Sequence, residues 1–182
     1  MATAIESLAG VYKLDPVHSS LHFAVRHIEV STFRASFAAV EAKLVAEAGA
    51  VELEGRAVVE SISIGDPPEF REHVVRSADF FDADEHPVIT FRSTSVELAD
   101  DGTATVSGDL TIRGIRRSIT AVGAHRPPTE DPFGNVRVGL ELRATVDRRS
   151  WDMNWQLPLP GGGDALGWEV ELTAQLELTR RS

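Results

Sequence analysis

Three long segments of this sequence alternate apolar and polar residues one by one, and no other feature constrains the fold as strongly. The apolar residues occupy the even positions of the segments 104–112, 136–146 and 168–178. Successive side chains of a β-strand point to opposite faces, so each segment predicts a strand with one buried and one exposed face. We therefore expect an all-β chain.

Shorter segments of the same kind predict further strands. They cover residues 20–26, 33–44, 51–59, 88–91 and 115–125. Within the second of these, the apolar set moves from odd to even positions, and a β-bulge near residues 38–40 would explain the shift. Turn residues such as Asp100-Asp101-Gly102 separate the segments, and no crossover helix lies between them, which favours antiparallel pairing.

The number of predicted strands is that of a closed barrel. A barrel of about eight strands can hold side chains or one ligand in its interior. The length of 182 residues suits one domain with a sizeable core. We therefore expect residues 1–182 to form one antiparallel β-barrel domain, with a two-layer sandwich as the alternative fold.

The one convincing helix signal follows the strand that ends near residue 59. Asp66 can act as N-cap, Pro67 fits the first helical position, and Glu69 completes a capping box. Phe70 and Val74 then lie four residues apart on one stripe. A helix this short needs a surface to pack on, so we expect it to lie near the barrel cavity as a lid that gates ligand entry.

Charge and composition exclude several classes of partner. The net charge of −10 and the pI near 5.0 argue against binding a nucleic-acid backbone or an anionic membrane surface. The chain has no cysteine, which excludes disulfides and thiolate chemistry. It has no apolar segment of roughly 20 residues and no basic, apolar leader at its N-terminus, so we expect a cytoplasmic protein without stable membrane insertion.

No residue pattern predicts a catalytic site, a metal site or a cofactor. On one extended strand His18 and His22 would stand about 13 Å apart, with His27 on the opposite face, so the three histidines cannot share a metal ion. The acidic residues between Asp79 and Glu85 lack the glycine and spacing of a calcium loop, and they fit a solvated turn better. There is no Gly-x-Ser-x-Gly nucleophile motif.

Four motifs, in order along nearly the whole chain, resemble the YceI-like family of polyisoprenoid-binding proteins. They are Leu14-Asp15-Pro16-Val17-His18-Ser19, the segment 71–81, Pro87 with Phe91 and Ser93, and the segment 108–114. The resemblance implies a lipocalin-like antiparallel barrel, usually a homodimer. It also implies a long apolar cavity that holds a polyisoprenoid chain, with a helical segment near its side.

The chain departs from the family pattern at two places. His73-Val74 stands where the family has His-Leu, and Arg148-Arg149-Ser150-Trp151-Asp152 stands where the family has Arg-x-x-Phe-Gly. The second departure puts larger side chains, Trp151 and Trp155, near one end of the expected pocket. Many members also carry export signals, so the periplasmic carrier role of such members is not expected here.

If the apolar strand faces point inward, they line the expected cavity. The predicted lining residues, with Phe70 on the helix, are Phe23, Val25, Phe37, Phe70, Phe80, Phe91, Leu110, Leu140, Leu142, Trp151 and Leu172. Each buried CH₂ contributes about 0.8 kcal/mol, so apolar walls alone can hold a polyisoprenoid or isoprenoid quinone, without a cofactor.

An anionic head group would have to stay in water or meet basic side chains. The candidates at the cavity mouth are Arg71, Arg76, Arg113, Arg116 and Arg117, and the alternative for all five is a set of solvated surface charges.

Two other functions remain open at this point. One is an enzyme that acts on an apolar isoprenoid with His18, His22 or Asp79 as acid or base, which requires a titratable side chain facing the cavity. The other is a filled barrel that serves only for dimerisation, which predicts no cavity. Alternation is the same in a filled and a hollow barrel, so the sequence does not separate them.

Overall fold

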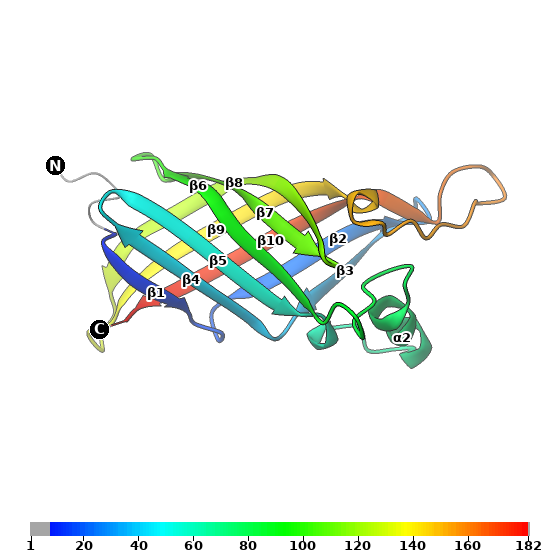
Figure 1. Cartoon of the computed structure of the whole chain (residues 1–182), viewed down its shortest axis with the longest axis horizontal. Helices are drawn as coiled ribbons and strands as arrows, with labels where there is room; N and C mark the ends of the chain where they lie inside the picture. The colour runs from blue at the N-terminus through cyan, green and yellow to red at the C-terminus, as the bar shows by residue number, and fades with distance from the viewer. Residues whose placement is uncertain (1–7, 182) are drawn as a thin grey trace.

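In the computed structural model, which describes residues 8–181, the chain forms a closed antiparallel β-barrel with one short α-helix at one end (Figure 1). Eight strands pair in a ring, in which the last strand returns to pair with the first. In order around the ring they are β1 (Gly10–Leu14), β4 (Val40–Glu47), β5 (Ala50–Val58), β6 (Val88–Leu98), β7 (Thr103–Ile112), β8 (Ile115–Glu130), β9 (Val136–Asp147) and β10 (Leu166–Arg180). The predicted barrel and its antiparallel pairing are confirmed.

Two further strands, β2 (Ser20–His27) and β3 (Ser31–Phe37), form a hairpin beside the ring. One edge of β10 pairs first with β2 and then, nearer its C-terminal end, with β1. Along β4, the pairing with β1 covers only the residues from Lys43 to Ala46. Residues 40–42 of β4 therefore pair with β5 but not with β1.

The expected bulge near residues 38–40 is instead the corner between two strands. β3 pairs with β2, whereas β4 pairs with β5 and β1. At the corner, the Ala38 amide donates to the Ser61 carbonyl oxygen at 3.0 Å, next to the short 3₁₀ helix η1 (Val59–Ser61). The shift of the apolar residues from odd to even positions marks this change of strand.

The predicted helix is present as α2 (Pro68–Arg76), at the end of the barrel where β5 ends and β6 begins (Figure 1). It starts one residue later than the capping signals indicate, because Pro67 takes the N-cap position and no side chain caps the helix. Val74 and Val75 are the buried residues of this helix. No helix among residues 8–181 is long and apolar enough to cross a membrane.

The core consists of two apolar clusters, one at each end of the barrel. The helix-end cluster joins α2 and its flanking segments to the strands, and it includes Val59, Val75, Phe81 and Trp151, the last of these on the 3₁₀ helix η2 (Arg148–Trp151). The far-end cluster lies towards the C-terminus and includes Tyr12, Leu44, Val106 and Leu178. Phe91 packs against both clusters, and the space between them holds the cavity described next.

Candidate functional site

A cavity of about 140 Å³ lies inside the barrel between the two clusters. The side chains that the strand alternation directs into it are apolar. The apolar lining residues are Leu21, Val40, Ala42, Leu53, Ala57, Ile89, Phe91, Val106, Leu110, Ile119, Ala121, Leu142, Ala144, Leu172, Ala174 and Leu176, with Gly55. The interior is therefore hollow at its middle and filled at its ends.

Small residues at inward positions keep the middle of the barrel open. This small-residue belt consists of Ala42, Gly55, Ala57, Ala121, Ala144 and Ala174. Ala42 and Gly55 are direct partners across β4 and β5, so two neighbouring strands carry almost no side-chain volume at the same level. Because side-chain volume normally fills a barrel of this size, the belt is the local cause of the cavity.

The ring of Phe91 limits the cavity on one side. A Cβ on Gly108 would stand 2.5 Å from the Phe91 Cζ and 2.4 Å from the Arg92 carbonyl oxygen. The ring therefore occupies the space that a side chain at residue 108 would need. Movement of the Phe91 side chain is the most direct way to enlarge the hollow.

The volume of the cavity limits what it holds as it stands. An apolar protein cavity of about 150 Å³ binds benzene, whereas sites for larger molecules measure roughly 300 Å³ or more. The present volume of about 140 Å³ thus matches one five-carbon unit of an isoprenoid. A longer chain requires neighbouring side chains to move.

Four of the predicted lining residues, Phe91, Leu110, Leu142 and Leu172, line this cavity. The other seven lie in the packed regions around it. Phe23, Phe37 and Trp151 are in the helix-end cluster and Leu140 is in the far-end cluster, while Val25 is buried on β2, Phe80 is buried behind α2, and Phe70 lies on the outer part of α2.

The small-residue belt is the part of the site that the sequence reasoning missed. Selection of large apolar residues overlooks inward positions that carry alanine or glycine. The signal was present in the alternation, because residues 42, 144 and 174 share the parity of their large apolar neighbours. In this barrel the small inward residues lie among large ones that also line the cavity, such as Leu53, Leu110 and Leu172.

Of the five arginines expected at the cavity mouth, three donate to protein groups at the helix end, whereas Arg116 and Arg117 are exposed on β8. Arg71 Nη2 lies 2.6 Å from the Glu60 carbonyl oxygen and 2.9 Å from Glu60 Oε2. Arg76 also pairs with Glu60, and Arg113 Nη1 donates to the Asp152 carbonyl oxygen at 2.7 Å. These contacts hold α2 and η2 in place at the helix end.

An aromatic cluster connects the α2 region to the long loop before β10. The ring centroids of His73 and Phe80 are 5.2 Å apart, and Trp155 lies 5.7 Å from Phe80 and 6.2 Å from His73. The Phe70 ring meets Phe33 of β3 edge-on at 5.7 Å. The segment that covers the helix end is therefore attached to the barrel on two sides.

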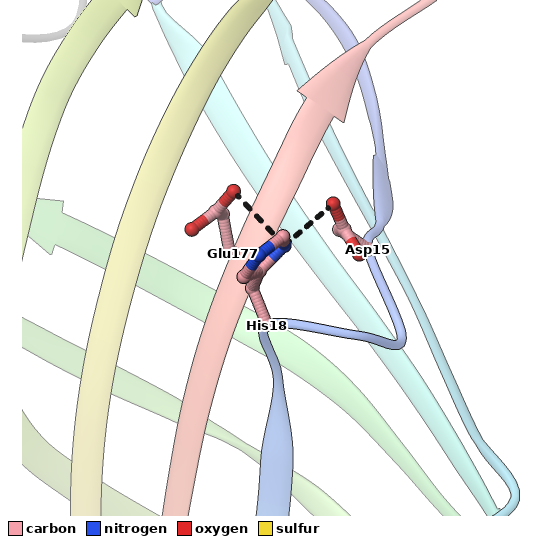
Figure 2. A group of neighbouring side chains, drawn as sticks. All are labelled: Asp15, His18 and Glu177. Carbon is pink, nitrogen blue, oxygen red and sulfur yellow. Dashed lines mark hydrogen bonds and ion pairs between the residues drawn. The ribbon is translucent and has the colours of Figure 1, made fainter.

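Three residues outside the cavity lining, Asp15, His18 and Glu177, have the composition of a metal site. Their ligand atoms lie within 4.8 Å of one another (Figure 2). His18 Nδ1 is 3.0 Å from Asp15 Oδ2 and 3.8 Å from Glu177 Oε1. His18 sits in the turn before β2, which is why the extended-strand spacing did not anticipate this group.

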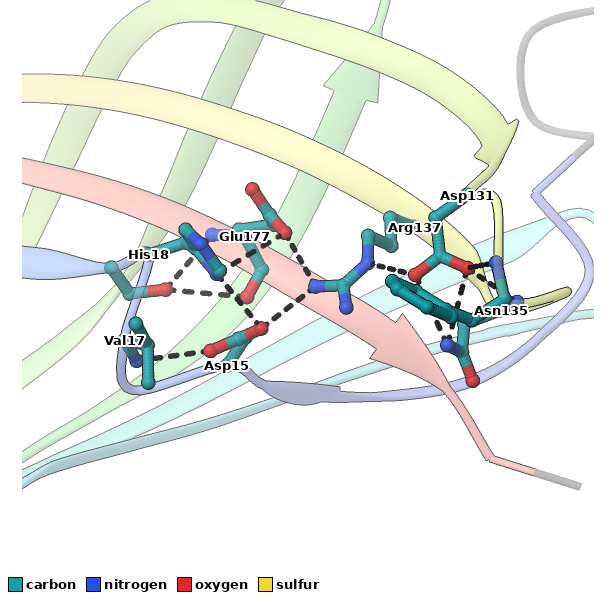
Figure 3. Close-up of polar contacts among 9 residues, drawn as sticks. Asp15, Val17, His18, Asp131, Asn135, Arg137 and Glu177 are labelled. Atoms are coloured by element: carbon teal, nitrogen blue, oxygen red, sulfur yellow. Dashed lines mark hydrogen bonds and ion pairs between the residues drawn. The ribbon is translucent and has the colours of Figure 1, made fainter.

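A guanidinium already occupies the position between the two carboxylates. Arg137 Nη1 lies 2.7 Å from Asp15 Oδ2 and 2.6 Å from Glu177 Oε1, and Arg137 Nε lies 2.7 Å from Asp131 Oδ2 (Figure 3). Hydrogen bonding to Arg137, and secondarily to His18, holds the pKa of Asp15 well below its usual range. The Arg137 side chain likewise lowers the pKa of Asp131.

Arg137 forms an ion-pair network with Asp15, Asp131 and Glu177. It ties the turn after β1 to β10 and to the hairpin between β8 and β9 (Figure 3). A cation would have to displace Arg137 from both carboxylates to bind there. Of the other residues considered as acid or base, His22 and Asp79 are exposed.

The chain is similar to known proteins along most of its length. The YceI-like domain matches residues 12–178 of the chain. A UPF0312 protein of Staphylococcus aureus (strain USA300) is 30% identical over 170 residues, which cover 92% of this chain and 96% of that protein. A UPF0312 protein of Ectopseudomonas mendocina (strain ymp) is 28% identical over 155 residues, covering 84% and 81%.

Solved structures share the fold at lower identity. BcnA of Burkholderia cenocepacia superposes with a TM-score of 0.72 at 19% identity, over 90% of this chain and 98% of that one. A polyisoprenoid binding domain from Saccharophagus degradans, implicated in plant cell wall breakdown, superposes with a TM-score of 0.71 at 15% identity, over 93% and 98%.

Proposed function

Because this chain belongs to the YceI-like family, we propose that it binds the chain of a polyisoprenoid or isoprenoid quinone in the apolar cavity of its barrel, for storage or transport. The observation that carries the proposal is the hollow held open by the small-residue belt, from Ala42 to Ala174. A similar fold in Saccharophagus degradans is described as a polyisoprenoid binding domain, which supports the same ligand class here.

The energetics favour a ligand with several isoprene units. Burial of one five-carbon unit contributes roughly 4 kcal/mol, which is comparable to the loss of translational and rotational freedom on binding. Stable retention thus needs more than the one unit that fits the cavity of about 140 Å³. We expect the rest of the chain to occupy space that Phe91 and the helix-end cluster now fill.

The α2 segment is the proposed lid of this site. It covers the helix end, and its contacts with the barrel are separable aromatic pairs, Phe70 with Phe33 and Phe80 with Trp155. Phe70 is 39% exposed, so its loss would weaken the closure without opening the core. A chain that extends past the cavity towards this end requires the lid to move.

Binding of this kind needs no covalent chemistry. The inward side chains around the cavity are apolar, and they offer a bound chain dispersion contacts and exclusion from water. His18, His22 and Asp79, the residues of the enzymatic alternative, do not belong to the cavity lining. We therefore infer a binding protein in preference to an isoprenoid-modifying enzyme.

A titration with geranylgeraniol tests the proposal. At Gly55 a Cβ would meet its nearest neighbours at 3.9 and 4.0 Å, so a side chain has room to start there, and the leucine of Gly55→Leu would extend into the cavity. We expect the wild type to bind geranylgeraniol and Gly55→Leu to lose at least about tenfold in affinity, the cost of roughly 1.4 kcal/mol. Val122→Leu, which adds carbon to the outer face of β8, is the matched control.

Two outcomes would contradict the cavity as the site. One is the absence of binding to the wild type, and the other is equal affinity of the wild type and Gly55→Leu. A melting temperature of Gly55→Leu close to that of the wild type would show that any loss of affinity comes from the filled cavity.

The expected homodimer and cytoplasmic location stay predictions. On the outer faces of the strands, the exposed large apolar residues of the described chain are Val11 on β1 and Val122 on β8. Sedimentation equilibrium of the wild type beside Val11→Glu and Val122→Glu measures whether either position lies in an interface.

A further inference from the structure

A second hollow lies on the outside of the barrel wall, opposite the cavity. It is a groove of about 1050 Å³ on the outer faces of β1 and of β4 to β8. Six basic side chains line it: Lys13, Lys43, Arg56, Arg92, Arg116 and Arg181. They outnumber the acidic residues of the groove, although the formal net charge of the whole chain is −10. The groove is therefore a local positive region on an acidic protein.

Two of these cations stand directly opposite each other. Lys13 on β1 and Lys43 on β4 are cross-strand partners, and both are exposed. Neither has an ion-pair partner among residues 8–181, and Glu54, which neighbours Lys43 on β5, lies 3.6 Å from Arg92 instead. Like charges in opposite positions repel across a sheet, and an anion bound between Lys13 and Lys43 would offset that repulsion.

The groove arginines also retain donors for an outside anion. Three of the four face one carboxylate each at a distance too long for a hydrogen bond: Arg56 and Glu41 at 3.6 Å, Arg92 and Glu54 at 3.6 Å, and Arg116 and Asp109 at 3.9 Å. Such exposed pairs contribute little to stability. By contrast, the arginines at the helix end donate to Glu60 and Asp152 at short range.

The groove and the cavity meet across one strand layer. Val40, Ala42, Gly55 and Phe91 line both. At this level β4 has no pairing with β1, since that pairing begins at Lys43. One layer of strands therefore separates the groove from the cavity. In this layer, the edge of β4 at residues 40–42 is not paired with β1.

We propose that this groove binds the anionic head group, a phosphate or diphosphate, of the isoprenoid whose chain fills the cavity. The inference rests on the proposed function. The isoprenoid chain passes the edge of β4 at residues 40–42 and extends through the small-residue belt towards the helix end. The charged group stays outside the apolar interior, where its burial would be costly, and accepts hydrogen bonds from Lys13, Lys43 and the groove arginines.

Calorimetric titrations with two ligands that share one chain test the head-group site. Geranylgeranyl diphosphate and geranylgeraniol are titrated into the wild type, the double variant Lys13→Gln/Lys43→Gln and the control Arg143→Gln, which removes an exposed arginine paired with Glu141 on β9. The wild type is expected to prefer the diphosphate. The double variant should lose about tenfold or more for the diphosphate and keep its affinity for the alcohol.

The outcomes separate this inference from the function on which it rests. Equal affinities of the wild type for both ligands, or an equal loss for both in the double variant, would overturn the head-group site while chain binding stands. Binding of neither ligand would overturn the proposed function as well.

Inorganic pyrophosphate is the third titrant, because it carries the same anionic chemistry without a chain. Weak binding that competes with the diphosphate lipid supports the head-group site. Binding of pyrophosphate as tight as that of the lipid would show a site for free phosphate compounds and would overturn the inference.

Discussion

Phe91 lies across Gly108, with its Cζ 2.5 Å from the position that a Cβ of residue 108 would take. The two residues lie diagonally across neighbouring strands, β6 and β7, because the direct partner of Phe91 is Leu110, two residues after Gly108. The glycine makes room for the ring, and the ring lines the cavity and packs against both apolar clusters. The pair therefore sets one boundary of the hollow.

Gly108→Ala should destabilise the fold by about 1–3 kcal/mol, because the new methyl group would overlap both the Phe91 ring and the Arg92 carbonyl oxygen. Gly55→Ala on β5 is the matched change, because the atom nearest to its new Cβ would be 3.9 Å away. Urea denaturation should show a lower midpoint for the first variant and little change for the second. Equal midpoints would contradict the close contact.

Phe91→Ala should enlarge the cavity and change which chain lengths bind. Truncation of this half-buried aromatic ring should cost up to about 3 kcal/mol of stability, so the variant is compared at low temperature, where it remains folded. We expect the ratio of the affinity for solanesol to the affinity for geraniol to be higher in the variant than in the wild type. An unchanged ratio would mean that the ring does not limit the chain.

Phe70→Ala tests the lid. The ring is 39% exposed and packs edge-on against Phe33, so its loss should cost less than about 1 kcal/mol of stability. Dissociation of a bound fluorescent isoprenoid should become several-fold faster. An off-rate equal to that of the wild type would remove the gating role of α2.

Arg137→Gln should reduce stability at neutral pH and flatten its acid dependence. Arg137 lowers the pKa values of Asp15 and Asp131 in the folded state. Depressed carboxyl pKa values contribute stability that is complete above about pH 4 and is lost as the pH falls through the folded-state values. The free energy of unfolding of the wild type should therefore fall more steeply below about pH 4 than that of the variant.

Urea denaturation at a series of pH values measures this difference. Arg143→Gln, which removes an exposed pair on the same strand, should leave the acid profile of the wild type unchanged. Parallel profiles for the wild type and Arg137→Gln would show that the network does not link stability to pH.

The fold was largely predictable because one physical signal dominates it. A strand with one buried face must alternate, so the inward faces of β7, β9 and β10 could be read from positions 104–112, 136–146 and 168–178. Short β1 was missed, since five residues give too little alternation to separate a strand from a loop. The corner at residues 38–40 was read as a bulge because both features shift the parity of the apolar residues.

The site was less predictable, because it depends on contacts between distant segments. Arg137 meets Asp15, which lies 122 positions away in the sequence, and no local pattern joins them. The strands of hollow and filled barrels show the same alternation of apolar and polar residues. In this protein the hollow depends on a few alanines and glycines, such as Ala42 and Gly55. Their importance follows only from the register that places them at one level.

The central claim is that the barrel holds an isoprenoid chain. The most direct measurement is mass spectrometry of an organic-solvent extract from the purified, denatured recombinant protein, with Gly55→Leu purified in parallel. We expect a polyisoprenoid or isoprenoid quinone in roughly one-to-one amount from the wild type and much less from the variant with the filled cavity. An empty extract from the wild type, together with no uptake of added isoprenoid, would contradict the central claim.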